Sequence, residues 1–145
     1  MIGPTRRILV VDDDAEVREL LYVALRKQGF QIDLASSAAE ALDLFKQNTY
    51  DLVTLDYAMP GINGLRLHQR LSELYGFGRR LAQFIPPRLP PTLVISGYGR
   101  EDLNQAWLAE EQVAAILPKP LRLAEFVAVV SEVVSRGLCG ERRGA

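Results

Sequence analysis

The chain has 145 residues but only one cysteine and one histidine, and it lacks any long apolar run. With a single cysteine, Cys139, no disulfide can form within the chain, which suits a reducing compartment. No stretch approaches the roughly 18 consecutive apolar residues that a membrane-spanning helix needs. The apolar run at residues 8–11 is too short for the hydrophobic region of a signal peptide, and acidic residues follow it. We therefore expect a cytoplasmic protein that does not associate with membranes.

The chain also lacks a strong net charge. A formal charge of -1 gives no overall attraction to nucleic acids, and the basic pair Arg142-Arg143 is too short to form a binding site for them. Apolar residues make up 48% of the chain and charged residues 24%, which is typical of one globular domain of this length. We place that domain at residues 6–135 and expect a flexible tail at 136–145. We expect no direct binding of nucleic acid by this chain.

Five apolar runs of strand length alternate along the chain with five stretches of helical periodicity. The strands are expected at residues 8–11, 30–35, 51–55, 92–95 and 114–117. The helices are expected at about residues 15–28, 38–45, 67–74, 101–111 and 123–135. Such alternation predicts a parallel α/β sheet with helices on both faces. An irregular connection at 75–91 is too apolar for a flexible linker, and either a packed loop or a partner surface would explain it.

Local signals mark several of these elements. Asp14 is a candidate N-cap and Gly29 a candidate C′ residue of the first helix, and Ser37 with Glu40 forms a capping box. Pro118 ends the fifth strand and cannot donate a ladder hydrogen bond, which favours an edge strand. The first helix is expected to bury one apolar face, made of Val17, Leu20, Leu21, Ala24 and Leu25. In the second strand, the better-buried face is expected to carry Phe30, Ile32 and Leu34.

Polar residues follow four of the predicted strands. Asp12 and Asp13 follow the first strand, Asp56 the third, Ser96 the fourth and Lys119 the fifth. In a parallel sheet these ends lie at one edge, where open α/β sheets bind ligands. Three nearby carboxylates repel one another and would suit a hard divalent cation, Mg²⁺ or Mn²⁺. A carboxylate can also attack phosphorus to form an aspartyl phosphate, so the set fits phosphoryl transfer.

Each of these residues also has an ordinary structural explanation. The acids at 12–14 could simply cap a helix, and Asp56 could cap the turn that follows it. Ser96 before a glycine is typical of a turn, and Lys119 alone is typical of a solvated surface. Only their joint placement at strand ends favours a functional site.

The sequence resembles the receiver domains of response regulators in two-component signalling. The matching segments are residues 8–14, 56–64, 94–97 and 119–120, and the resemblance covers roughly residues 6 to 135. It implies a flavodoxin-like (βα)5 doubly wound sheet with strand order 2-1-3-4-5.

The resemblance also implies a role for each site residue. Asp56 would be the phosphoacceptor, loaded from the phosphohistidine of a sensor histidine kinase or a histidine phosphotransfer protein. Asp13, Asp56 and the backbone carbonyl of Ala58 would ligate Mg²⁺ directly, and Asp12 would act through water. Ser96 and Lys119 would hold the phosphoryl group, and the Lys119-Pro120 peptide would be cis.

Signalling would then proceed through the surface of the fourth helix, fifth strand and fifth helix, which could also form a homodimer. The chain would have no enzymatic activity beyond self-phosphorylation and self-dephosphorylation. One departure is Ile116, which occupies the position where the family usually has an aromatic switch residue.

Three other functions fit parts of the pattern. A degenerate receiver would serve only as a protein-interaction module, which Ile116 leaves open. A phosphohydrolase with an aspartyl nucleophile would need a general acid two residues after Asp56, where Ala58 stands. A nucleotide-binding domain would need a glycine-rich loop after the first strand, where residues 12–14 are acidic.

Overall fold

The computed structural model describes residues 6–56, 70, 90–96 and 113–144, and those residues contain one five-stranded parallel sheet. The strand order is β2-β1-β3-β4-β5, which confirms the flavodoxin-like order implied by the resemblance. The strands are β1 (Arg7–Val11), β2 (Gln31–Ala35), β3 (Leu52–Asp56), β4 (Thr92–Ser96) and β5 (Val113–Pro118). The described helices are α1 (Ala15–Arg26), α2 (Ala38–Gln47) and α5 (Leu123–Gly144).

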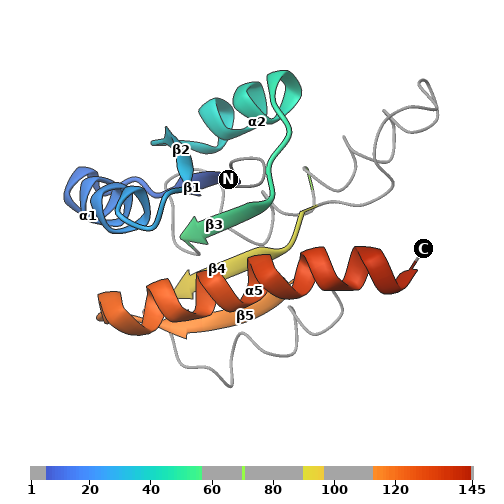
Figure 1. Cartoon of the computed structure of the whole chain (residues 1–145). Helices are drawn as coiled ribbons and strands as arrows, with labels where there is room; N and C mark the ends of the chain where they lie inside the picture. The colour runs from blue at the N-terminus through green and yellow to red at the C-terminus, as the bar shows by residue number, and fades with distance from the viewer. Residues whose placement is uncertain (1–5, 57–69, 71–89, 97–112, 145) are drawn as a thin grey trace.

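Helices cover both faces of the sheet, as Figure 1 shows. On one face, α1 and α5 pack against side chains such as Ile8, Val10 and Leu52; on the other, α2 packs against Leu9 and Val53. Every residue of β3 and β4 is buried, and both strands lie in the interior of the sheet. The side chains of β3 enter the packed layer on each face, Leu52 on one and Val53 on the other. This double coverage explains why the central strands read as continuous apolar runs rather than as alternating patterns.

The predicted ends of α1 are confirmed by hydrogen bonds. The side chain of Asp14 accepts hydrogen bonds from the backbone N–H groups of Glu16 and Val17, so Asp14 is the N-cap. At the other end Gly29 has φ +93°. The N–H of Gly29 donates to the carbonyl of Arg26, and the next N–H donates to the carbonyl of Leu25, the pattern of a Schellman motif with Gly29 at C′.

The N-terminal cap of α2 differs in one hydrogen bond from the predicted capping box of Ser37 and Glu40. Ser37 is the N-cap, and its hydroxyl accepts from the N–H of Glu40, as expected. The carboxylate of Glu40, however, accepts from the N–H and the hydroxyl of Ser36 rather than from Ser37. The hydrogen bond from the Ser36 N–H is the main reason that the pKa of Glu40 is lowered.

Two expected core residues are exposed instead. Leu20 on α1 is 52% exposed and Leu34 on β2 is 37% exposed, so both predictions were wrong. The buried side of α1 is centred on Leu21 and Leu25, and Leu20 lies about 100° around the helix from Leu21. Leu34 lies on an edge strand, where only one neighbouring strand is available to cover a side chain.

Strand ends shift by one residue at most from their predicted places, and one helix is much longer than predicted. β3 and β4 include Asp56 and Ser96, and β5 is an edge strand that reaches Pro118, as its proline indicated. Helix α5 was expected to end near residue 135, but it continues to Gly144. No proline lies in residues 136–144, and adding residues to a helix that has already formed is much easier than starting one. The domain boundaries at residues 6 and 135 stay predictions.

Several predictions fall outside the described residues. They concern the third and fourth helices, the backbone carbonyl of Ala58 and nearly all of the connection at 75–91. Residue 70 alone is described within the predicted third helix, and it is helical. Among the described residues, no helix combines the length and the apolar character needed to cross a membrane.

Candidate acidic site at the carboxyl edge of the sheet

Asp12 lies directly after β1 and is almost fully buried, with 1% of its surface exposed. Its N–H donates to the carbonyl of Ala35, which extends the pairing of β1 with β2 by one residue. One carboxylate oxygen, Oδ1, accepts from the N–H of Asp14 at 2.9 Å. The other, Oδ2, is buried without a hydrogen-bond partner in the described part of the chain. A buried carboxylate oxygen with no partner is unfavourable unless something else satisfies it.

The three consecutive acids divide into two roles. Asp14 caps α1, whereas the carboxylates of Asp12 and Asp13 approach that of Asp56. Asp13 is exposed, while Asp12 is buried. The capping explanation that the sequence left open for residues 12–14 therefore holds for Asp14 alone.

Asp56 is the last residue of β3 and is 2% exposed. Its Oδ1 accepts a hydrogen bond from the Lys119 Nζ at 3.1 Å, across 63 residues of sequence. The backbone N–H of Lys119 donates to the carbonyl of Ser96 at 2.9 Å, which connects the ends of β4 and β5. The Lys119-Pro120 peptide is cis, as the resemblance implied. The strand ends therefore bring Asp56, Ser96 and Lys119 to the same edge.

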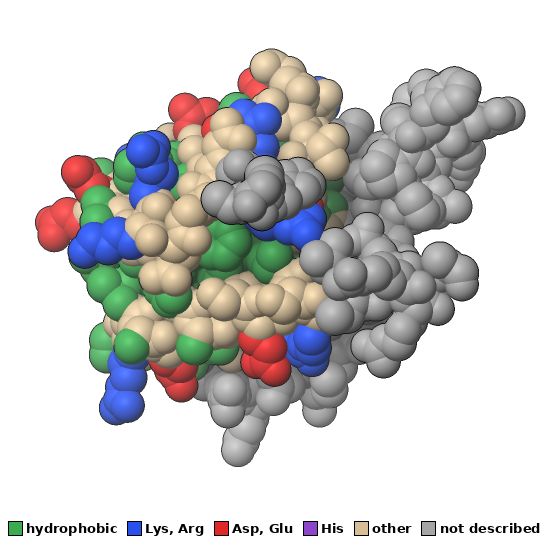
Figure 2. Space-filling model, in the orientation of Figure 1, with side chains coloured by type: hydrophobic (Ala, Val, Ile, Leu, Met, Phe, Trp, Pro, Cys, Tyr) green, Lys and Arg blue, Asp and Glu red, His purple; other side chains and the backbone are tan. Residues whose placement is uncertain are grey.

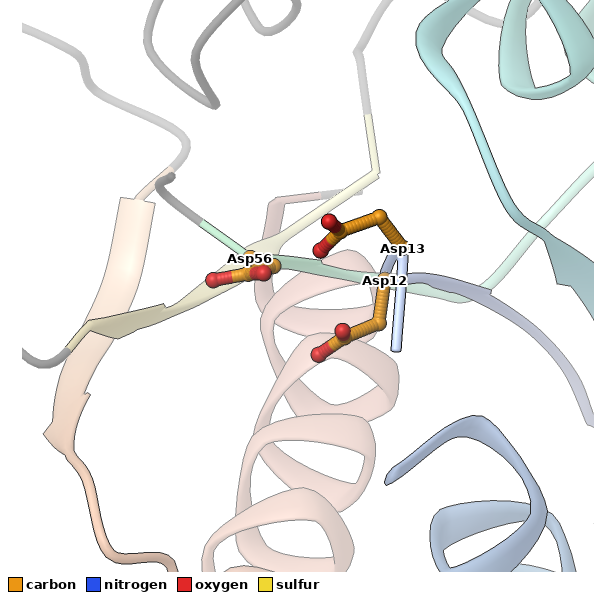
Figure 3. A group of neighbouring side chains, drawn as sticks. All are labelled: Asp12, Asp13 and Asp56. Atoms are coloured by element: carbon orange, nitrogen blue, oxygen red, sulfur yellow. The ribbon is translucent and has the colours of Figure 1, made fainter. Parts of the chain in front are cut away.

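Asp12, Asp13 and Asp56 form a group that could hold a metal ion. Each offers one carboxylate oxygen, and these oxygens lie within 4.8 Å of one another. Figure 3 shows the three side chains converging from the ends of β1 and β3. The set fits a hard divalent cation, because all three groups are carboxylates and Asp12 has one buried oxygen without a hydrogen-bond partner among the described residues.

The charges of the site act on its own titrating groups. Burial raises the pKa of Asp12 to about 6, against the opposing hydrogen bond from the N–H of Asp14, and the negative charge of Asp56 raises it further. Burial alone would lower the pKa of Lys119, but the hydrogen bond and charge of Asp56 outweigh it, so the pKa is raised. Lys119 therefore stays protonated, and within the described residues one ammonium faces three carboxylates.

Two residues near the site were missed by the sequence analysis. Arg18 on α1 donates from Nη1 to the backbone carbonyl of Asp12 at 2.7 Å. Thr54, two residues before Asp56, is 1% exposed, and its hydroxyl has no partner in the described residues. Arg18 could have been suspected because it follows the N-cap Asp14 by one helical turn, whereas an isolated threonine in a strand carries no such signal.

The structure places two of the remaining residues that the sequence singled out, and their roles stay predictions. Ser96 is buried at the end of β4. Ile116 pairs in register with Val94 and is partly buried, so the position of the family's aromatic switch lies inside the sheet ladder. The backbone of Ala58, the fourth predicted metal ligand, lies outside the described residues.

Comparison with known proteins identifies the family. The model of the response regulator receiver domain matches residues 8–131. The chain is 35% identical over 137 residues to Response regulator MprA of Mycobacterium sp. (strain KMS), covering 90% of this chain and 51% of that protein. It is 31% identical over 130 residues to the CpxR homolog of Haemophilus influenzae, a transcriptional regulatory protein, with the same coverage. The chain thus spans about half the length of these curated relatives.

Solved structures of receiver domains are also similar to this chain. A CheY-like receiver domain from Methanospirillum hungatei has a TM-score of 0.79 at 19% identity, covering 94% of this chain and 99% of that one, which supports the fold. The response regulator TrrA of Thermotoga maritima, solved in complex with Mg(2+)-BeF, has a TM-score of 0.64 at 31% identity, covering 89% and 99%. The chain therefore belongs to the family of response regulator receiver domains of two-component systems.

Proposed function

We propose that this receiver domain accepts a phosphoryl group on Asp56 from the phosphohistidine of a sensor histidine kinase or a histidine phosphotransfer protein. The observation that carries the proposal is the position of Asp56. It is buried at the carboxyl end of β3, 3.1 Å from the Lys119 ammonium, and its carboxylate lies in one group with those of Asp12 and Asp13.

The proposed phosphoryl transfer forms one bond and breaks one, and groups of the site stabilise the phosphoryl oxygens. A carboxylate oxygen of Asp56 forms a bond to phosphorus while the bond between phosphorus and the donor imidazole nitrogen breaks, and the imidazole leaves with that electron pair and takes up a proton. Lys119 offers positive charge beside the accepting oxygens, and the Ser96 hydroxyl would donate a hydrogen bond to the phosphoryl group. Both residues stand at the strand ends next to Asp56.

Asp12, Asp13 and Asp56 would hold a Mg²⁺ or Mn²⁺ ion, with the Ala58 carbonyl as a further ligand. When bound, the ion supplies positive charge to the phosphoryl oxygens as charge develops on them. The chain's own acids would position that ion, and burial of Asp56 would limit access of water to the acyl phosphate. We further propose that phosphorylation alters the surface that includes β5 and α5, where an output partner or a second copy would bind.

Intact-mass spectrometry after incubation with Mg²⁺ and a small acyl-phosphate donor tests the proposal. The native protein should gain one phosphoryl group, which hydroxylamine should remove, and chelation of the metal should prevent the gain. Asp56→Asn should abolish it. Asp51→Asn is a matched control, because Asp51 stands just before the other end of β3 and pairs with Arg6.

The same experiment separates the competing functions. A native protein that binds Mg²⁺ but gains no phosphoryl group would be a degenerate receiver, and the proposal would be wrong. Steady turnover of a generic phosphate ester that depends on Asp56 would instead indicate a phosphohydrolase.

A further inference from the structure

The turn between β1 and α1 carries two of the three acids but has little sheet pairing of its own. β1 ends at Val11, and among the described residues the bond from the Asp12 N–H to the Ala35 carbonyl is the last backbone hydrogen bond to β2. Beyond it, the turn is held within itself, because Oδ1 of Asp12 accepts from the N–H of Asp14 and the Asp14 side chain caps α1. The direction of the Asp12 and Asp13 side chains therefore depends on how firmly this turn is held.

Arg18 supplies a contact from outside the turn. Its Nη1 donates to the carbonyl of Asp12 at 2.7 Å, across six residues of sequence and in a partly buried setting. A hydrogen bond from a guanidinium is short and strong because its donor is charged. The backbone N–H of Arg18 also bonds to the carbonyl of Asp14, so the same residue is joined to both ends of the turn.

The guanidinium also lies close enough to the start of α2 for its charge to act on Glu40. Glu40 in turn accepts from the N–H and the hydroxyl of Ser36, just after β2. The charge of Arg18 is the weakest of the effects on Glu40, so the contact that restrains the Arg18 side chain is its hydrogen bond to the Asp12 carbonyl.

We propose that Arg18 is a positioning residue of the acidic site: it fixes the Asp12 carbonyl so that the carboxylates of Asp12 and Asp13 face Asp56 in the arrangement that a divalent cation needs. This role rests on the proposed metal binding. Groups that orient metal ligands from outside the ligand set typically change metal affinity by about 10- to 100-fold when they are removed.

The direction in which Mg²⁺ affinity changes when Arg18 is replaced distinguishes a positioning role from a purely electrostatic one. A cation near an acidic site weakens the binding of a second cation, so removing the charge of Arg18 would strengthen Mg²⁺ binding if charge were its only effect. Removing a positioning residue weakens binding instead. Arg18→Met removes both charge and hydrogen bond, whereas Arg18→Lys keeps the charge with a shorter, less directional donor.

Isothermal titration of metal-free protein with Mg²⁺ measures the effect. Arg18→Met should weaken the affinity by about tenfold, and Arg18→Lys should restore part of it. Arg26→Met is the matched control, because Arg26 is eight residues along the same helix, about 12 Å away, and donates to Tyr22 on the exposed side. The Arg26→Met variant should bind Mg²⁺ with the affinity of the native protein. Tighter binding by Arg18→Met, or binding equal to that of Arg26→Met, would overturn the proposal.

A second measurement does not need the metal. Hydrogen exchange of the Asp14 amide, which donates to Asp12, should be faster in metal-free Arg18→Met than in Arg26→Met when both are compared at equal global stability. Equal exchange would mean that Arg18 does not hold the turn, and would overturn the proposal. If the native protein binds no Mg²⁺, the proposed function fails and the role of Arg18 toward a metal fails with it. If the native protein binds Mg²⁺ and only the Arg18 variants behave unexpectedly, the proposed function stands.

Discussion

At the scale of single residues, identical side chains in the chain do different work because their surroundings differ. Asp14 caps a helix, Asp12 is buried with one oxygen unpaired, and Asp13 is exposed at the mouth of the same group. The three are the same residue type at consecutive positions, so residue type alone does not distinguish their roles. Their roles follow from the direction in which the turn after β1 points each one.

The buried hydroxyl of Thr54 leads to a prediction about stability. The side chain lies on the face of the sheet that packs against α1 and α5, between Val10 and Leu93 in register, and its hydroxyl has no hydrogen-bond partner in the described residues. A buried polar group without a partner costs about 1–3 kcal/mol. Thr54→Val should therefore raise the free energy of unfolding in urea by roughly 1 kcal/mol or more.

Thr92 provides the control for this substitution. It is equally buried, but its hydroxyl donates to the carbonyl of Pro90 at 3.4 Å. Thr92→Val should give no gain in stability and could give a small loss. A lower stability for Thr54→Val than for the native protein would contradict the prediction, because it would mean that the hydroxyl has a partner in solution.

At the scale of elements, the ends of the helices were easier to predict than their buried faces. Caps depend on residues within a few positions of each other, and Asp14, Gly29 and Ser37 act as predicted. Which side of α1 is buried depends on the sheet beneath it, and Leu20 was wrongly assigned to the core. The same reason applies to Leu34, because its exposure depends on β2 being an edge strand.

The C-terminal end of α1 gives a second prediction. Gly29 has φ +93°, and a Cβ added there would meet no atom within 4 Å. Any loss of stability in Gly29→Ala therefore comes from the strained backbone conformation alone, and it should lower the free energy of unfolding by about 1–2 kcal/mol. Gly29→Asn should lose less, because asparagine tolerates this conformation better than alanine does. Chemical denaturation of both variants would measure the difference, and an unchanged stability in Gly29→Ala would show that the turn rearranges.

At the scale of the whole molecule, the two edges of the sheet are charged differently. Near the amino ends of the strands opposite charges pair: Arg7 lies 3.1 Å from Asp33, Arg6 lies 3.7 Å from Asp51, and Tyr50 donates to Asp33. At the carboxyl edge, in the part of the chain that the structure describes, three carboxylates lie beside one ammonium, that of Lys119. Figure 2 shows acidic and basic side chains spread over one outer face of the molecule, with apolar side chains between them. The imbalance at the carboxyl edge is the feature that suits a cation.

This imbalance predicts how stability depends on pH. The pKa of Asp12 is about 6 in the folded protein, against 3.8 for an unperturbed aspartate. Between these values the folded state holds a proton on Asp12 that the unfolded state has released, so the contribution of Asp12 to stability is fully present below about pH 4 and is lost as the pH rises through 6. The loss attributable to Asp12 should be about 3 kcal/mol.

Urea denaturation across this pH range, without divalent cations, measures the effect against Asp12→Asn. The variant has no carboxyl group at this position, so its stability should change less over the same range, and it should be more stable than the native protein at pH 7. Identical pH profiles for the two proteins would contradict the prediction. Saturating Mg²⁺ should reduce the loss in the native protein, because it binds the ionised carboxylate.

The sequence alone determined the order and approximate places of the described strands and helices and the residues that cap α1. It also determined that Asp12, Asp13, Asp56, Ser96 and Lys119 lie at or just after the carboxyl ends of strands. These features depend on apolar periodicity and turn chemistry within a few residues, and so they are local. Only the tertiary structure decided that Lys119 reaches Asp56, that Arg18 holds the Asp12 carbonyl, and that Leu20, Leu34 and Thr54 have unexpected surroundings. Those outcomes depend on strand order and on neighbours distant in sequence, which no local pattern specifies.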